Sequence, residues 1–316
     1  SSLSPPSTSP SPSPPSSASP PPSASPPSLH ESPQLKPASC SATAHETSLS
    51  RFNQFIRTLT SVVGLDSTGA GIRAVHSSGG VAGGVVSEGQ GYGLMMGGIL
   101  AGALPADHSN RAQTIETAFE LFLGWRRMCE LTVELSCQDT RFCGQDNAHE
   151  CLPSWKFDDQ LSAEVGTGSA PDGDEDAILG MILLVLATEH DSPKPAWWDD
   201  VAQWAFQSCF AFLEHSTLAH PTLLASNGQP LRALKLGSCW GGWDCNNPSY
   251  HAPGHYLAMR DYMAYRGVAQ LEAQWDALIE TSYLIVGDSQ CPATGLVPNW
   301  FVPSQSNEPG AGTPAC

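Results

Sequence analysis

Seven stretches of the chain repeat apolar residues at the three- and four-residue spacing that places them on one face of an α-helix. Segments rich in Gly and Pro separate these stretches, and the alternation typical of strands is scarce. Ser48 or Ser50 is the expected cap of the first helix. The pattern predicts an all-α domain with functional residues on loops at one end. The expected helices are 49–63, 91–104, 112–129, 175–188, 197–214, 253–265 and 271–286.

The N-terminal segment has a different composition. The first 37 residues contain 13 Pro and 14 Ser, with no aromatic residue. Such a segment cannot bury enough apolar surface to offset its ordering entropy. We expect residues 1–40 to form a disordered spacer with polyproline II character, a composition also found in O-glycosylated stalks. Residues 41–316 are long enough for one large domain with its own core.

The net charge of −17, with only 14 Lys and Arg, argues against binding to a phosphate backbone, because such binding depends on basic side chains. No nucleic-acid partner is expected. No apolar run reaches the roughly 20 residues that span a bilayer, so no membrane partner is expected either. The chain begins at Ser1 without Met, and any targeting segment is expected to have been removed or left out. We expect a secreted, monomeric protein.

All ten cysteines follow residue 39, and four of them lie between 129 and 151 at spacings of 8, 6 and 8. Their even number and expected loop positions favour an oxidising compartment. The closely spaced Cys-x-x-Cys pairs of structural zinc sites are missing, so disulfides are predicted in preference to a metal cluster. The connectivity stays open, and no metal or other cofactor is expected.

Three short runs carry chemical information: SEGQGYG at 87–93, APDGDED at 170–176 and NPSYHAP at 247–253. Carboxyl groups surrounded by Gly and aromatic residues, instead of Lys and Arg, suit an enzyme that holds an uncharged sugar and moves protons at a glycosidic oxygen. Each acidic residue could also be a helix-terminal acid stabilised by the helix dipole. An EF-hand calcium loop starting at Asp172 is not predicted. Such a loop needs Gly at its sixth position and Glu at its twelfth, and here these are Ala177 and Leu183.

Together and in this order, the three runs resemble glycoside hydrolase family 8, whose members hydrolyse β-1,4 glucans, mixed-linkage β-glucan, xylan or chitosan with inversion. The resemblance covers about residue 45 to the end and implies an (α/α)6 barrel. Glu88 matches the family's general acid, and Asp172 matches the residue that contacts the sugar at the cleavage subsite. Tyr250 matches the tyrosine that orients a water. Pro171 departs from the Ser or Thr that the family usually carries there.

A general acid works best when it is partly shielded from water, and we expect Tyr92 and Met95 to shield Glu88. The glycines of the first run are expected to let the sugar approach the backbone closely. His251 and His255 lack a third ligand at metal spacing, so they are interpreted as buried or rim histidines. Flat indole rings suit the apolar faces of pyranose rings, although any one Trp more often fills the core. The residues expected to bind substrate are Tyr92, Trp155, Asp174, Trp240, Trp243, Asn247 and Tyr250.

An inverting enzyme needs a second carboxylate on the opposite face of the sugar. In the family this is an Asp in a Tyr-Asp-Ala-x-Arg run, which is not found before Cys316. We therefore expect the base and the last helices of the barrel to lie beyond Cys316, with Glu308 as an in-chain candidate for the base.

Two classes of function stay open. One is an inverting endo-acting hydrolase, with β-1,4-glucan (cellulose) as the favoured substrate and chitosan, xylan or mixed-linkage β-glucan as alternatives. The other is a non-catalytic carbohydrate-binding or cell-wall structural protein. In both, the Ser/Pro-rich segment is a candidate for cell-wall association.

Overall fold

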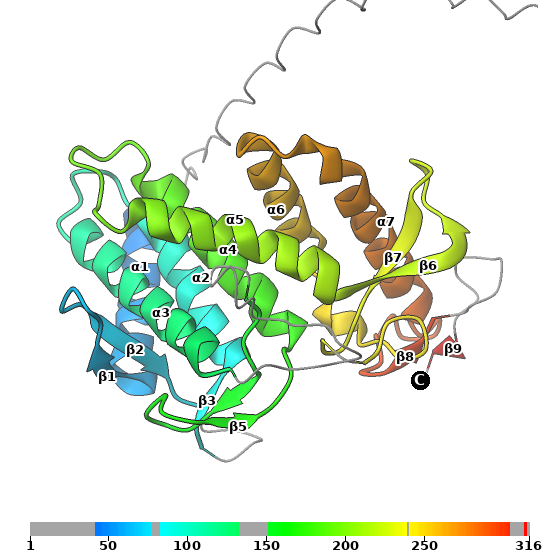
Figure 1. The fold of residues 1–316 in the computed structure, drawn as a ribbon, viewed down its shortest axis with the longest axis horizontal. Coiled ribbons are helices and arrows are strands. Elements are labelled where there is room, and N and C mark those ends of the chain that lie inside the picture. Colours follow the sequence, from blue (N-terminus) through cyan, green and yellow to red (C-terminus); the bar gives the residue numbers. More distant parts are fainter. Residues whose placement is uncertain (1–41, 78–82, 133–150, 239, 304–312, 315–316) are drawn as a thin grey trace, which may run out of the picture.

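The computed structural model describes residues 42–77, 83–132, 151–238, 240–303 and 313–314. This part contains the seven expected α-helices (Figure 1). Two short 3-10 helices, η1 (Pro248–Tyr250) and η2 (Ala269–Leu271), precede the last two α-helices. The predicted spacer at residues 1–40 lies outside the described residues. The α-helices are α1 (Ala42–Leu59), α2 (Ser87–Ala103), α3 (Arg111–Leu131), α4 (Pro171–Thr188), α5 (Trp198–His215), α6 (Pro253–Tyr265) and α7 (Glu272–Ser289).

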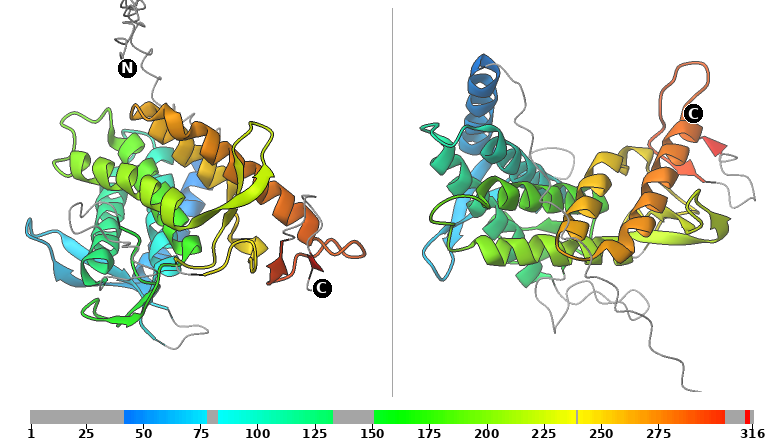
Figure 2. Two further views of the ribbon diagram at one scale, coloured as in Figure 1. Left: turned by 45° about the vertical axis from the view of Figure 1, so that its right-hand side comes forward. Right: turned by 90° about the horizontal axis from the view of Figure 1, so that it is seen from above.

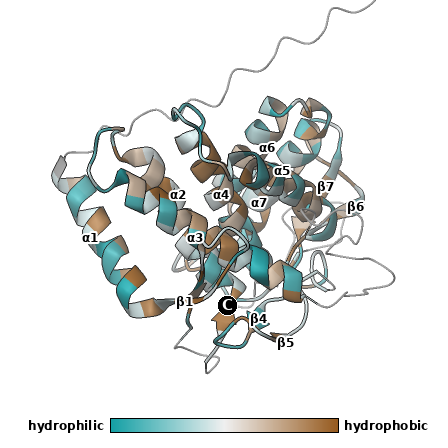
Figure 3. Ribbon diagram, turned by 60° about the vertical axis from the view of Figure 1, so that its left-hand side comes forward, coloured by the Kyte–Doolittle hydropathy of each residue, from teal (hydrophilic) through white to brown (hydrophobic). Residues whose placement is uncertain are grey.

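Helix α4 lies at the centre of the helical assembly. It contacts α2, α5 and α6, and Figure 3 shows that much of it is hydrophobic. Most of its residues are buried, as expected for a helix that is apolar on most of its sides. Helices α1 to α3 lie on one side of it, and α6 and α7 lie on the other (Figure 2).

The α2–α4 pair packs unusually closely because glycines face each other. A Cβ added at Gly98 would lie 2.6 Å from the carbonyl oxygen of Gly180, and one at Gly180 would lie 2.6 Å from the carbonyl carbon of Leu94. About two turns nearer the N-terminus of each helix, a Cβ at Gly91 would lie 2.5 Å from the carbonyl oxygen of Gly173. Any side chain at these positions would push the two backbones apart.

Short antiparallel strands connect the helices and are more numerous than the sequence predicts. One hairpin follows α1 and another follows α5, and a small three-stranded sheet precedes α2 and α4. The strands are β1 (Thr60–Leu65) with β2 (Gly71–Val75), β3 (Val85–Val86) with β4 (Lys156–Phe157) and β5 (Glu164–Gly166), β6 (Thr217–Leu224) with β7 (Pro230–Leu234), and β8 (Phe301–Val302) with β9 (Thr313–Pro314).

Several predicted helix ends are wrong. The first helix begins at Ala42, so Ser48 and Ser50 lie inside it instead of capping it. It ends at Leu59, and Thr60 starts strand β1 by pairing with Val75. Thr and Val are β-branched and favour strands once a partner strand is available.

The starts of α2 and α4 correct a second prediction. The runs at 87–93 and 170–176 were expected in loops, but both lie mostly within the first turns of helices. Ala170, held in an extended conformation (φ −125°, ψ 113°), precedes Pro171 at the first helical position. This is the arrangement that proline imposes on the residue before it and favours at a helix start.

The predicted loop positions of the cysteines are also partly wrong. Cys129 and Cys209 lie inside α3 and α5, where both are buried and neither forms a disulfide. They act there as small apolar side chains of the main core. In the described part of the chain, no helix is both long and apolar enough to cross a membrane.

Candidate active site

The three-stranded sheet brings two helix N-termini to the same end of the molecule. The backbone N–H of Ser87, at the start of α2, donates to the carbonyl of Trp155 at 2.9 Å. The N–H of Trp155 donates to the carbonyl of Gly168 at 2.8 Å, just before α4. Helices α2 and α4 both begin directly after these contacts, and their close packing fixes their relative position. Glu88 and Asp172, each in a first turn, therefore lie at one site.

Glu88 is exposed and holds one hydrogen bond within its own helix. The hydroxyl of Tyr92 donates to Oε1 of Glu88 at 3.0 Å, across one helical turn. Burial, followed by this hydrogen bond and the Glu88 charge, raises the pKa of the Tyr92 phenol, so Tyr92 stays a donor. The expected shielding of Glu88 is wrong for the protein alone, because the carboxyl faces solvent and Tyr92 is itself 44 % exposed.

The glycines of the same run have a structural role that differs from the predicted one. Gly91 meets α4, and a Cβ at Gly93 would lie 3.0 Å from a methyl group of Val75. Gln90, which the sequence analysis did not single out, is fully buried and joins three elements. Its side chain accepts from the N–H of Val75 and donates to the carbonyls of Arg73 and Leu121. These residues hold the start of α2 in place.

Asp172 is half-buried, and Tyr250 reaches it from η1. Burial raises the pKa of Asp172 to about 6, and the charges of Glu88 and Asp176 act in the same direction, while a hydrogen bond from the N–H of Gly173 opposes them. Burial, the charges of Asp172 and Glu88, and a hydrogen bond to Asp172 raise the pKa of Tyr250 to about 12. The hydroxyl of Tyr250 is thus a donor to Asp172 near neutral pH.

The other acidic residues of α4 differ sharply in exposure. Asp174 has no exposed surface, and its carboxyl interacts with the side chain of Ser169. Burial, followed by the charge of Asp172, raises its pKa well above the usual range. Asp174 therefore cannot contact substrate as predicted, because successive helical residues are 100° apart and Asp174 points into the core.

Asp176 forms an inter-helix contact. Its Oδ1 lies 2.9 Å from Nε2 of His255 on α6. His255 is half-buried, and the interpretation of it as a rim histidine fits this position. The pair ties α4 to α6 one turn inside the helix from Asp172.

The predicted tryptophans separate into exposed and buried residues. Trp240 is 55 % exposed and lies beside Trp300, which is 50 % exposed, with ring centroids 6.4 Å apart. The sequence analysis missed Trp300, because nothing in its local pattern distinguishes an exposed Trp from a core Trp. Trp155 is half-buried, and its ring covers Gly166.

Two further predictions of substrate contact are not supported. Trp243 is only 7 % exposed, donates to the carbonyl of Leu218 at 3.0 Å and packs edge-on against His220. It belongs to a small second core with the β6–β7 hairpin. Asn247 uses its side-chain oxygen to cap η1, accepting from the N–H and hydroxyl of Ser249. Its position is explained by this local cap.

A series of hydrogen-bonded polar side chains holds η1 in place. His251 lies between Asn246, whose Oδ1 is 2.9 Å from Nε2, and Ser282, whose Oγ is 2.9 Å from Nδ1. The side-chain amide of Asn246 donates to the carbonyl of Leu234, so its oxygen accepts from His251. Burial of the ring lowers the pKa of His251 to about 3, which favours the neutral ring. The segment that carries Tyr250 is thereby fixed to α7.

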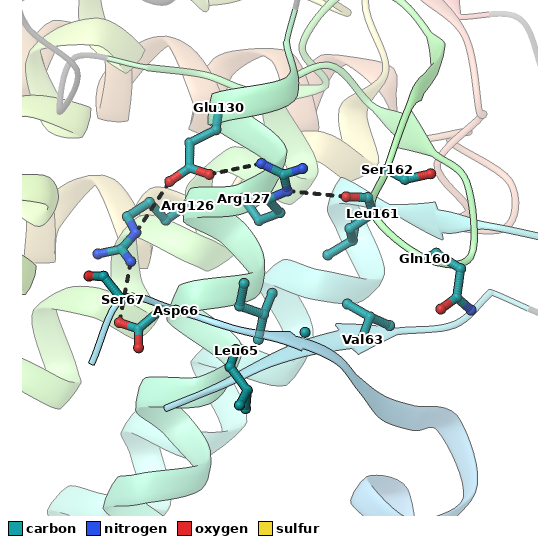
Figure 4. A pocket seen from close by; sticks show the side chains of 12 residues that line it. Val63, Leu65, Asp66, Ser67, Arg126, Arg127, Glu130, Gln160, Leu161 and Ser162 are labelled. Atoms are coloured by element: carbon teal, nitrogen blue, oxygen red, sulfur yellow. Dashed lines mark hydrogen bonds and ion pairs between the residues drawn. The ribbon is translucent and has the colours of Figure 1, made fainter. Parts of the chain in front are cut away.

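No group of three or more potential metal-binding side chains occurs among the described residues. Glu308, the in-chain candidate for the base, lies outside them. A pocket of about 580 Å³ lies apart from Glu88 and Asp172, between the β1–β2 hairpin, α3 and the β4–β5 turn. Figure 4 shows that Arg126 and Arg127 in this pocket are already engaged by Asp66, Glu130 and the carbonyl of Leu161.

Comparison with known proteins identifies the family of this chain. The family model described as glycosyl hydrolases family 8 matches residues 142–313, more than half of the chain. Endoglucanase 2 of Ruminiclostridium josui is 26 % identical over 164 residues, which are 51 % of this chain and 31 % of that protein. Endoglucanase A of Acetivibrio thermocellus is 29 % identical over 170 residues, 52 % of this chain and 29 % of that protein.

Solved structures share the fold. A β-1,3-1,4-glucanase from Paenibacillus sp. X4 superposes with a TM-score of 0.55 at 18 % identity, covering 85 % of this chain and 60 % of that one. A reducing-end-xylose releasing exo-oligoxylanase gives 0.54 at 16 % identity, covering 86 % and 63 %. The fold is thus that of α/α-barrel glycoside hydrolases. The chain belongs to glycoside hydrolase family 8. It spans about a third of the length of these curated relatives.

Proposed function

We propose that the protein hydrolyses internal β-1,4 bonds of a polysaccharide by inversion, with Glu88 as the general acid. The observation that carries this proposal is the exposed Glu88 carboxyl, held by Tyr92, at the same end of the packed α2–α4 pair as Asp172 and Tyr250. Family membership and the two endoglucanase relatives support it. In this mechanism Glu88 protonates the leaving oxygen, and Asp172 and Tyr250 contact the sugar at the cleavage subsite.

β-1,4-Glucan is the proposed substrate. The relatives of highest sequence similarity described above are named endoglucanases, whereas the structural neighbours include a β-1,3-1,4-glucanase and an exo-oligoxylanase. The exposed rings of Trp240 and Tyr92 suit an uncharged sugar. Initial rates on carboxymethylcellulose, lichenan, xylan and chitosan test the choice. Hydrolysis of chitosan alone would refute it.

The proposal also includes secretion, supported by the ten cysteines and the Ser/Pro-rich segment.

An inverting mechanism requires a base carboxylate roughly 6.5 to 9.5 Å from the acid. We do not assign this base to any described residue.

The decisive experiment is Glu88→Gln, which keeps the side-chain shape but cannot donate a proton. We expect kcat to fall by about 10² to 10⁴-fold with little change in substrate affinity. Glu272→Gln is the matched control, since Glu272 lies in the first turn of α7. Near-normal kcat for Glu88→Gln would make Glu88 a helix-terminal acid only. Polysaccharide binding without any hydrolysis by the unaltered protein would favour the non-catalytic class.

A further inference from the structure

Asp176 and His255 meet where α2, α4 and α6 converge, next to the candidate site but outside the roles assigned above. Asp176 follows Asp172 by one helical turn, so the two carboxyls lie on neighbouring positions of one face. A Cβ at Gly91 of α2 would lie 3.1 Å from Cβ of Asp176, so Asp176 packs against the first turns of α2. His255 contacts it from α6 at 2.9 Å.

Asp176 interacts electrostatically with all the helices around it. Its charge raises the pKa values of Asp172 and Glu175 on its own helix, of Tyr92 on α2 and of Tyr256 on α6, in each case after burial. The basic group in contact with it is His255. Among the described residues, the titratable groups that face Asp176 or Asp172 are Glu88, Tyr92, Asp174, Glu175, Tyr250, His255 and Tyr256.

We propose that the Asp176–His255 pair is a positioning pair that sets the charge state of Asp172. The negative charge of Asp176 disfavours a second negative charge on Asp172, and a proton on His255 offsets that effect. The pair therefore determines how readily the sugar-contacting carboxyl ionises. Its relevance to hydrolysis rests on the proposed function, whereas the coupling itself does not.

The two partners must then act in opposite directions. Removing the negative charge with Asp176→Asn should lower the pKa of Asp172 toward its ordinary value. Removing the cation with His255→Gln should raise it. Each shift is expected to be about half a unit to one unit, the size of a charge interaction across one helical turn in a half-buried site. His255→Lys restores a positive charge and should bring the pKa of Asp172 back to or below its original value.

Carboxyl titration by NMR measures this directly. The chain is labelled with ¹³C at the side-chain carboxyl of Asp, the Asp172 signal is assigned by its loss in Asp172→Asn, and its pH titration is followed in each variant. Amide spectra confirm that each variant is folded. His108→Gln is the matched control, because His108 pairs with Glu46 at 3.3 Å, away from α4. It should leave the Asp172 titration unchanged.

Shifts of opposite sign for Asp176→Asn and His255→Gln, with recovery in His255→Lys, would support the proposal. Shifts of the same sign, or no shift in either variant, would overturn it, because a purely structural link would not respond to the sign of the charge. If Asp176→Asn fails to fold, the His255→Gln and His255→Lys pair decides the question. The titration needs no substrate, so it measures this coupling whether or not the proposed function holds.

Discussion

Within the described part of the chain, one side chain, Tyr92, orients Glu88 by a hydrogen bond. The Tyr92 hydroxyl lies 3.0 Å from Oε1 of Glu88, and both residues are on exposed turns of α2. A hydrogen bond to a solvent-accessible carboxyl contributes modestly, roughly 1 kcal/mol. In the proposed mechanism it holds the acid toward the leaving oxygen, since small misplacements reduce rates strongly.

We therefore predict that Tyr92→Phe lowers kcat by about five- to tenfold and changes KM much less, because the ring is kept while the donor is lost. Steady-state kinetics on the preferred glucan measure both constants. Tyr283→Phe is the control, since Tyr283 is an exposed tyrosine on α7. An unchanged kcat in Tyr92→Phe would mean that Glu88 is oriented by substrate alone.

At the level of elements, the α2–α4 contact determines the site, because Glu88 and Asp172 begin these two helices. Glycines at 91 and 98 face glycines at 173 and 180, so the backbones touch without side chains between them. Glycine costs about 1 kcal/mol of helix stability relative to Ala. That cost is offset by packing that the sequence pattern alone does not reveal.

We predict that Gly180→Ala destabilises the protein by about 1 to 3 kcal/mol, despite its higher helix propensity, because the new methyl group would overlap the α2 backbone. The control is Gly287→Ala on α7, where an added Cβ meets nothing within 4 Å. That change should be neutral or stabilising by up to about 1 kcal/mol. Urea unfolding measures both. Equal effects at the two positions would contradict the close approach of α2 and α4.

At the scale of the whole molecule, buried titratable groups make stability depend on pH. His251 stays neutral in the folded protein down to about pH 3, because burial lowers its pKa to about 3. In the unfolded chain the same ring takes up a proton below about pH 6.5. Falling pH thus favours the unfolded state between about 6.5 and 3. Buried Asp174 has the opposite effect on the pH dependence of stability. Its pKa is raised in the folded protein, so falling pH favours the folded state.

Replacing His251 isolates its contribution to the pH dependence of stability. The free energy of unfolding lost on His251→Gln should be greater at pH 7 than at pH 5 by about 2 kcal/mol, the proton-binding free energy of one unfolded-state histidine over that range. Urea unfolding at both pH values measures the difference, and His190→Gln on the exposed surface is the control. A pH-independent difference would show that the ring titrates freely in the folded protein.

Much of the architecture could be predicted from the sequence because helical periodicity is a local property. The apolar positions of each stretch, such as Phe52 and Phe55 in α1, determine which face is buried, whatever the neighbours are. The runs around Glu88 and Asp172 stand at the starts of α2 and α4, and their catalytic roles stay predictions. The ends of elements were less predictable. Thr60 leaves the helix only because strand β2 lies beside it.

Only the tertiary structure decided which candidate residues face the site. Asp172 and Asp174 are two residues apart on one helix, yet one lies beside Tyr250 and the other is fully buried. Trp240 and Trp243 are three residues apart in one loop, and only Trp240 is exposed. Residue type and spacing do not distinguish such neighbours. Burial depends on which distant segment packs against each face, and that contact is absent from the local sequence.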